Sequence, residues 1–194
     1  MGKLILIRHS AVELEPGVPA HRWRLSMDGR ARCLLMAPAL AAFKPDLIVT
    51  SHEPKAIETG RILAGVLGLP CEAADGLHEH DRRGTPFFEK QEAFAAAVAA
   101  FFAQPDQLLF GRETAVQAGA RFVNAVTRLT AQYPEKKVAV VAHGTVITLF
   151  LASFNAFIDP FELWCSLTLP CFFVVSPPQM KLKQSWFTCP AQGR

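Results

Sequence analysis

Residues 3–10 read KLILIRHS, and this stretch points to a buried strand that carries functional groups at its end. The four aliphatic residues from Leu4 to Ile7 form a short apolar run, as expected for a strand that is covered on both faces in a parallel sheet. Arg8 and His9 then end the run with a cation and an imidazole. A charged pair at this point is the first sign of a site at a strand end.

Further apolar runs and helical patterns follow this strand. Short buried strands are predicted at 3–7, 46–50 and 137–142, and two later strands at 170–175 and 180–187. Helices are predicted at 54–67 and 146–157, and at 27–43, where Ser26 is a candidate N-cap and Leu34, Leu35, Leu40 and Phe43 supply the apolar positions. Strands that alternate with helices predict an α/β fold, a three-layer sandwich with a mostly parallel central sheet and helices on both faces.

The middle of the chain departs from this alternation. Residues 75–86 are polar and are predicted to form a loop, and two helical stretches follow at 87–103 and 113–133. We interpret about 87–133 as a helical insertion within a single domain that spans residues 1–194.

Composition excludes several classes of protein. The chain has 194 residues, of which 51% are hydrophobic, so it can bury a full core and is neither disordered nor fibrous. Its formal charge of +3 is too small for a nucleic-acid binder. Five cysteines form no C-x-x-C pair, and Arg8 cuts short the first apolar run before it resembles a secretory signal. We therefore expect reduced thiols, at Cys33, Cys71, Cys165, Cys171 and Cys189, and a cytoplasmic location.

One apolar segment is long enough to cross a bilayer. Residues 138–158 contain no Asp, Glu, Lys or Arg. The segment is interrupted by His143 and Gly144, and its first part is β-branched whereas its second is rich in Leu and Phe. We interpret it as buried strand, turn and buried helix, and expect no membrane association.

Chemistry is expected where the strands end. Parallel strands bring their carboxyl ends to one edge of a sheet, where ligands bind. Imidazoles and two cations would meet there, which suits holding a phosphoryl group and attacking it with a nitrogen nucleophile. The strand-end residues are Arg8, His9 and Ser10, then Ser51, His52, Glu53 and Lys55, and finally His143, Gly144 and Thr145.

The order of these segments resembles the histidine phosphatase superfamily, also called the phosphoglycerate mutase-like family. Its R-H-G opening is matched by LIRHS at 6–10, and its late H-G by VAHG at 141–144. Four motifs between them match in order: LSMDGR at 25–30, SHEPKAIET at 51–59, LHE at 77–79 and, loosely, RET at 112–114.

This resemblance implies a role for each matched residue. His9 takes the position of the nucleophile that forms a phosphohistidine. Arg8, Lys55 and His143 take those of phosphate-binding groups, and His143, if protonated, also adds charge to stabilise the transition state. Glu79 takes that of the general acid and base, which calls for a pKa raised toward neutrality. The catalytic candidates are thus His9, Glu79 and His143, with no metal or cofactor.

The sequence departs from the family pattern at two places. Lys55 replaces an arginine and cannot grip two oxygens in one plane. Val12 and Glu15 replace polar phosphate helpers, so Glu15 either faces solvent or recognises a cationic part of a substrate. Residues around the matched positions are candidates for contacting the substrate: Ser10, Glu15, Trp23, His52, Arg82 and Gly144.

The predicted function is a metal-independent phosphatase acting on a phosphomonoester or phosphoramidate, in a small molecule or a phosphoprotein. A non-catalytic phosphate-binding or scaffold protein on the same fold is the alternative, and a phosphoglycerate mutase is disfavoured by the short interval between Glu79 and His143. His78, Glu79, His80 and His52 lack the spacing of a zinc site. The sequence does not indicate an oligomeric state.

Overall fold

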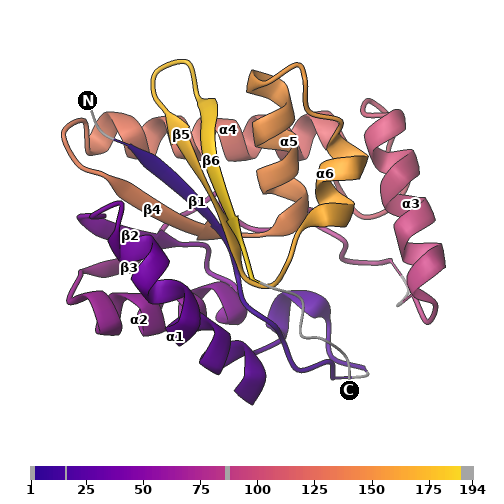
Figure 1. The fold of residues 1–194 in the computed structure, drawn as a ribbon. Coiled ribbons are helices and arrows are strands. Elements are labelled where there is room, and N and C mark those ends of the chain that lie inside the picture. Colours follow the sequence, from indigo (N-terminus) through magenta and orange to yellow (C-terminus); the bar gives the residue numbers. More distant parts are fainter. Residues whose placement is uncertain (1–2, 16, 86–87, 189–194) are drawn as a thin grey trace.

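The computed structural model describes residues 3–15, 17–85 and 88–188. These residues form a six-stranded sheet in the order β3-β2-β4-β1-β5-β6 (Figure 1). The first four strands in that order are mutually parallel, whereas β5 pairs antiparallel with both β1 and β6. The predicted, mostly parallel sheet is confirmed. The strands are β1 (Leu4–Arg8), β2 (Leu47–Thr50), β3 (Cys71–Ala73), β4 (Val138–Ala142), β5 (Cys171–Ser176) and β6 (Lys181–Phe187).

Helices cover both faces of the sheet (Figure 1). Alternate residues of β1 point to opposite faces, so that Ile5 and Ile7 pack with one cluster of core residues while Leu4 and Leu6 pack with the other. The first cluster joins the sheet to α1 (Met27–Ala41) and α2 (Pro54–Leu67). The second joins it to α3 (Gln91–Ala103), α4 (Ala115–Gln132), α5 (Gly144–Phe154) and the neighbouring α6 (Pro160–Ser166).

Local sequence signals account for several helix ends. The Ser26 side chain accepts a hydrogen bond from the Gly29 amide, as expected for the N-cap of α1. Gly68 ends α2 in the left-handed conformation, with φ of 65°, and α2 has the predicted bounds. Thr114 and Gln117 form a reciprocal capping box at the start of α4.

The predicted apolar face of α1 is wrong in part. Leu34 and Leu35 are 54% and 72% exposed. The side of α1 that faces the sheet consists mainly of small or slender residues at helical spacing, which lets the helix approach the strands closely. These residues are Gly29, Cys33, Met36, Ala37 and Leu40. The chain also forms β3 and α6, which the sequence did not predict.

The central part of the chain contains α3 and α4, which correspond to the two predicted helices. Phe122 of α4 packs on Phe150 of α5 within the core, so α4 is an integral part of the layer on that face. The predicted start of the first helix at residue 87, and Cys189, lie outside the described residues. The assignment of 1–194 as one domain with an insertion stays a prediction.

Residues 138–158 fold as strand, turn and helix, as predicted. They contain β4, then His143 as the residue before α5, and α5 itself. Within the described ranges, no helix combines the length and the apolar character needed to cross a membrane.

Candidate active site

The carboxyl ends of β1, β4 and β2 lie side by side. Arg8 pairs with Ala142 across β1 and β4, and Thr50 pairs with Val141 across β2 and β4. The ladder continues one residue further, because the amides of His9 and Ser51 each donate to a β4 carbonyl at 3.0 Å. The sheet register therefore brings the residues that follow three strands to one edge.

His9 is buried, and its ring has a defined hydrogen bond. Its Nδ1 lies 2.8 Å from the Ser10 carbonyl oxygen, which can only accept. Nδ1 therefore carries the proton, and Nε2 of the neutral ring keeps its lone pair. Burial, followed by the proximity of His143, Lys55 and Arg8, holds the pKa of His9 well below its usual value. The ring is thus neutral at neutral pH.

The loop after β1 is fixed by contacts with α1 and α2. The Ser10 amide donates to the Thr59 hydroxyl at 3.1 Å, and the Ser10 hydroxyl donates to the Gly29 carbonyl at 2.7 Å. A Cβ at Gly29 would lie 1.9 Å from the Ala11 carbonyl oxygen, so the backbones meet here only because this residue is glycine. The glycine of the 25–30 motif thus serves to seat the loop that carries His9.

His143 is fully buried between β4 and α5, beside His9. The two ring centroids are 5.2 Å apart. Nε2 of His143 lies 2.7 Å from the Ser51 hydroxyl and 3.4 Å from Glu53 Oε1. Burial first, and then the charge of Lys55, hold the pKa of His143 well below its ordinary value, so the ring is neutral and the expectation of a protonated His143 is wrong here.

Two buried nitrogen atoms at this edge have no hydrogen-bond partner within the described residues: Nε of Arg8 and Nδ1 of His143. Arg8 is anchored through another nitrogen, which donates to the Leu167 carbonyl at 2.8 Å. A Cβ at Gly144 would lie 3.1 Å from Arg8 Nε, so glycine keeps this approach open. Buried donors without a protein partner are suited to bind the oxygens of an anion.

Lys55 also reaches the site, together with a carboxylate to which the sequence assigned no role. Its Nζ lies 2.5 Å from Glu53 Oε2 and donates to the Ala20 carbonyl at 2.7 Å. Both side chains of this ion pair are more than nine-tenths buried. The signal in the sequence was the occurrence of Glu53 and Lys55 together at the start of a helix that follows a strand.

Glu79 caps the start of α5. Its Oε2 accepts from the Thr145 amide at 3.1 Å, and its Oε1 accepts from the amides of His80 at 2.8 Å and Val146 at 3.3 Å. Burial raises the pKa of Glu79, but the charge of Arg82 and the hydrogen bonds from these amides act against burial, and the pKa lies below its usual value. The predicted upward shift is wrong for this site.

The loop that carries Glu79 is held by Arg121 of α4, which the sequence did not single out. The Arg121 guanidinium donates to the carbonyl oxygens of Gly76, His78 and Glu79 at 2.8 to 3.2 Å. It also pairs with Glu113, 2.5 Å away. An arginine on α4 thus links the RET motif to the position of the candidate acid.

Other candidates lie at the margin of this cluster. Arg82 lies with its guanidinium carbon 5.0 Å from the centre of the Phe94 ring, and its charge affects the pKa of both Glu79 and His143. Glu15 is exposed. The Trp23 indole donates to the Val18 carbonyl at 2.9 Å and so closes its own loop.

The four residues considered for zinc do not share a centre. His52 is exposed and pairs with Asp75 at 3.0 Å, whereas the His80 ring packs 4.3 Å from that of Phe101. In the part of the chain that the structure describes, no group of three His, Cys, Asp or Glu residues is placed to hold a metal ion.

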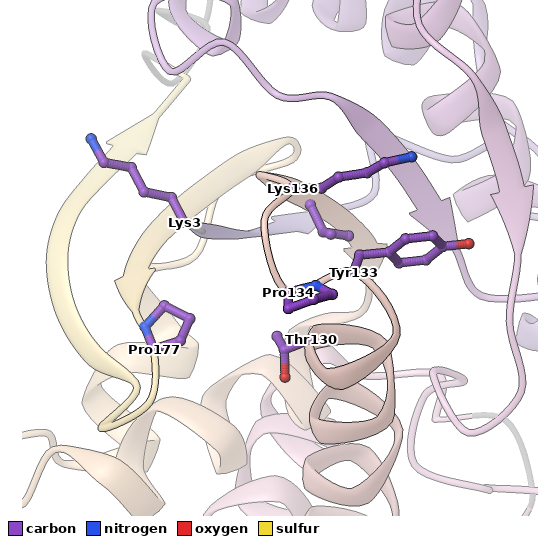
Figure 2. Close-up of a pocket in the computed structure, with 7 residues that line it drawn as sticks. Lys3, Thr130, Tyr133, Pro134, Lys136 and Pro177 are labelled. Atoms are coloured by element: carbon purple, nitrogen blue, oxygen red, sulfur yellow. The ribbon is translucent and has the colours of Figure 1, made fainter. Parts of the chain in front are cut away.

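Two surface hollows lie away from these strand ends. A small pocket of about 40 Å³ lies where β1 and β4 begin, at the opposite end of both strands, and is lined by Lys3, Thr130, Tyr133, Pro134, Lys136, Val138 and Pro177 (Figure 2). A groove of about 470 Å³ lies along α4 and α5 and includes Val116, Val123 and Leu149. Neither of these two hollows is lined by His9, His143 or Glu79.

The chain resembles known phosphatases in sequence and in fold. The chain is 29% identical over 116 residues to an uncharacterized phosphatase, PhoE, of Bacillus subtilis (strain 168), in a match that covers 58% of this chain and 55% of that protein. The chain thus matches only about half the length of this curated relative.

Solved structures share the fold. A phosphoserine phosphatase from Entamoeba histolytica in complex with 3-phosphoglyceric acid superposes with a TM-score of 0.77 at 18% identity, over 97% of this chain and 98% of that one. A mycobacterial glucosyl-3-phosphoglycerate phosphatase in complex with inorganic phosphate gives 0.73 at 21% identity, over 100% of both chains. The family model of the histidine phosphatase superfamily (branch 1) matches residues 4–167. This chain therefore belongs to the histidine phosphatase superfamily.

Proposed function

We propose that the protein is a phosphatase that hydrolyses a phosphomonoester or a phosphoramidate through a phosphohistidine on His9, without a metal ion. The observation that carries the proposal is the 2.8 Å hydrogen bond between His9 Nδ1 and the Ser10 carbonyl. Because that bond holds the ring proton on Nδ1, Nε2 is available as a nucleophile. The lowered pKa of His9 supports the same role, since a protonated ring has no lone pair to donate.

The phosphoryl group is held by the donors at the strand ends. Arg8 Nε and His143 Nδ1 are buried and have no partner among the described residues, so phosphoryl oxygens can satisfy both. Lys55 Nζ has three N–H groups, of which Glu53 and the Ala20 carbonyl take two, and the third remains for the ligand. These donors stabilise the charge on the equatorial oxygens in the transition state.

The reaction takes two steps. In the first, the Nε2 lone pair of His9 forms a bond to phosphorus while the bond from phosphorus to the leaving group breaks, and Glu79 donates a proton to the departing atom. In the second, water attacks phosphorus, Glu79 takes a proton from that water, and the N–P bond breaks to release phosphate and restore His9. A bound phosphoryl anion brings negative charge near Glu79, which raises its pKa and favours the protonated form that the first step needs.

A generic aryl phosphate tests the proposal. We expect wild type to hydrolyse p-nitrophenyl phosphate between mildly acidic and neutral pH, and His9→Ala to lose about 10³-fold or more of this activity because it lacks the nucleophile. When the phosphoryl group of the substrate is radiolabelled, wild type should retain acid-labile label on the protein, and the variant should not. Equal turnover by both proteins would sink the mechanism. A chelator should leave the rate unchanged, and loss of activity on chelation would overturn the metal-free part of the proposal.

One observation favours a second candidate function. Glu53 forms an ion pair with Lys55, a cation that the reaction needs. This pairing suits a protein that binds a phosphorylated ligand without turning it over. A panel of small phosphorylated metabolites and phosphohistidine peptides separates the two. Binding of inorganic phosphate by wild type, with no turnover of any member of the panel, would favour the binding protein. Phosphoserine belongs in that panel because a protein of similar fold is named for it.

A further inference from the structure

We propose that Glu53 determines which ionic form of the phosphoryl group this site accepts, selecting a group with one negative charge over a group with two. The inference rests on the proposed phosphate site and adds a residue to which the proposed mechanism gives no role. It follows from the contacts of Glu53, from the charges around it and from the hydrogen-bonding capacity of Lys55.

Both oxygens of the Glu53 carboxylate are engaged inside the site. Oε2 contacts Lys55 Nζ at 2.5 Å, and Oε1 accepts from the Glu79 amide at 2.9 Å. Oε1 also lies 3.4 Å from Nε2 of His143. The side chain is only 9% exposed, so water screens its charge weakly. Glu53 is therefore a fixed negative charge among the groups proposed to bind phosphate.

This charge opposes the binding of an anion. A phosphoryl oxygen that takes the third N–H of Lys55 shares that nitrogen with Glu53, so the two anions lie close together. The Coulomb repulsion from Glu53 is twice as large for a phosphoryl group with two charges as for one with a single charge. A singly charged group also keeps an O–H, which can donate to a carboxylate oxygen and turn repulsion into a hydrogen bond.

The charge balance of the site makes this effect matter. Three cations, Arg8, Lys55 and Arg82, face two carboxylates, Glu53 and Glu79. Both imidazoles of the site are neutral, because burial holds their pKa values well below the ordinary range. The histidines add no charge to offset Glu53, so one carboxylate removes a large share of the net attraction for a dianion.

The groups that face Glu53 come from three elements. They are Lys55 on α2, His143 at the start of α5, and His78 with Glu79 in the loop after β3. Burial, followed by the charge of Arg121, lowers the pKa of His78, and burial lowers that of His143. Both rings therefore take up a proton only at a lower pH than an ordinary histidine does. Inorganic phosphate itself passes from one negative charge toward two between about pH 6 and about pH 8.5.

Calorimetric titration with inorganic phosphate tests the inference without requiring turnover. The ratio of Kd at about pH 8.5 to Kd at about pH 6 compares the dianion with the monoanion. We expect Glu53→Gln to lower this ratio by about tenfold relative to wild type, because the amide keeps the size of the side chain and removes the charge that repels a dianion more than a monoanion. Glu58→Gln is the matched control. It removes one negative charge on the same helix, where Glu58 pairs with Arg30 and Arg24, and should keep the wild-type ratio.

Each outcome separates the inference from the proposed function. If phosphate binds and Glu53→Gln keeps the wild-type ratio, Glu53 does not select the ionic form, whatever the enzyme does. If wild type binds no phosphate at either pH, the phosphate site itself is wrong and the inference falls with it. A test on wild type alone covers the case in which the variant does not fold. Sulfate has no proton to give at about pH 6 and should bind about tenfold more weakly than phosphate. Equal affinity would overturn the inference.

Discussion

Glu79 occupies a position that stabilises its anion. Three backbone amides at the start of α5 and in its own loop donate to the carboxylate, and the N-terminal end of a helix favours negative charge. A general acid must nevertheless hold a proton when the leaving group departs. Under the proposed mechanism that proton depends on the charge of the bound phosphoryl group, which would couple acid catalysis by Glu79 to substrate binding.

The role of Glu79 as a general acid can be tested with substrates that differ in their leaving group. Glu79→Gln keeps the shape of the side chain but cannot transfer a proton. We expect its kcat/KM for an alkyl phosphate, which reports only the steps up to departure of a leaving group that needs a proton, to fall by about 10² to 10⁴. For p-nitrophenyl phosphate, whose leaving group departs as a stable anion, we expect a loss of less than about tenfold. Steady-state kinetics on the two substrates measures the difference, and equal losses on both would show that Glu79 does not protonate the leaving group.

Individual residues of the site were predicted from the sequence to different degrees. The order of motifs was enough to name His9, His143 and Glu79, because strand ends and motif spacing are local properties. The partnership of Glu53 with Lys55 and the direction of the pKa shift of Glu79 depend on contacts between segments far apart in the chain. Such contacts and the balance between burial and neighbouring charge exist only in the folded protein.

Helix α4 links the core of one face of the sheet to the edge that carries the candidate site. Its apolar side packs into the core through Phe122, while Arg121, the next residue back, holds the loop that carries Glu79. Arg121 accomplishes this with three hydrogen bonds to backbone carbonyls and an ion pair to Glu113. A rigid helix in contact with a catalytic loop keeps the acid within reach of its target.

Substitution of Arg121 should reduce turnover more than it reduces binding. Arg121→Met leaves the carbonyls of Gly76, His78 and Glu79 without their donor, so the loop shifts and kcat should fall by about tenfold or more, while KM changes little. Arg128→Met is the control, because Arg128 is an exposed arginine on the same helix. A loss of kcat that is equal in both variants would contradict a role for Arg121 in positioning the loop.

Secondary-structure elements with strong local signals were predicted well. Helix α2 begins at Pro54 and ends before Gly68, and both residues fix the backbone locally. Strand β3 and helix α6 were missed because they are short and depend on neighbours: β3 pairs along β2, and α6 packs against α3 and α5. The face of α1 was assigned wrongly at Leu34 and Leu35, because the helix turns these two residues away from the sheet while Met36 and Leu40 face it.

The folded protein keeps several histidines in their neutral form. Burial lowers the pKa values of His9, His143, His78 and His80, most strongly for the first two. In the unfolded chain these rings titrate near the ordinary value of about 6.5. On acidification the unfolded state therefore takes up protons that the folded state does not, so folding becomes less favourable as the pH falls below this value.

This linkage predicts how stability depends on pH. The free energy of unfolding should be nearly constant from about pH 8 to about pH 7, and should then fall below about pH 6.5, since each neutral histidine contributes up to about 1.4 kcal/mol per pH unit. A second decline should follow below about pH 4, because the folded state keeps Glu79 and Asp81 ionised, with the pKa of Asp81 lowered by Arg83 to about 2.

Urea unfolding at a series of pH values measures how the free energy of unfolding changes with pH. His143→Asn should reduce the change of the free energy of unfolding with pH below about pH 6.5 by the contribution of one proton, because it removes one ring that takes up a proton on unfolding. A wild-type free energy that does not change between about pH 7 and about pH 5 would show that the buried rings titrate alike in both states.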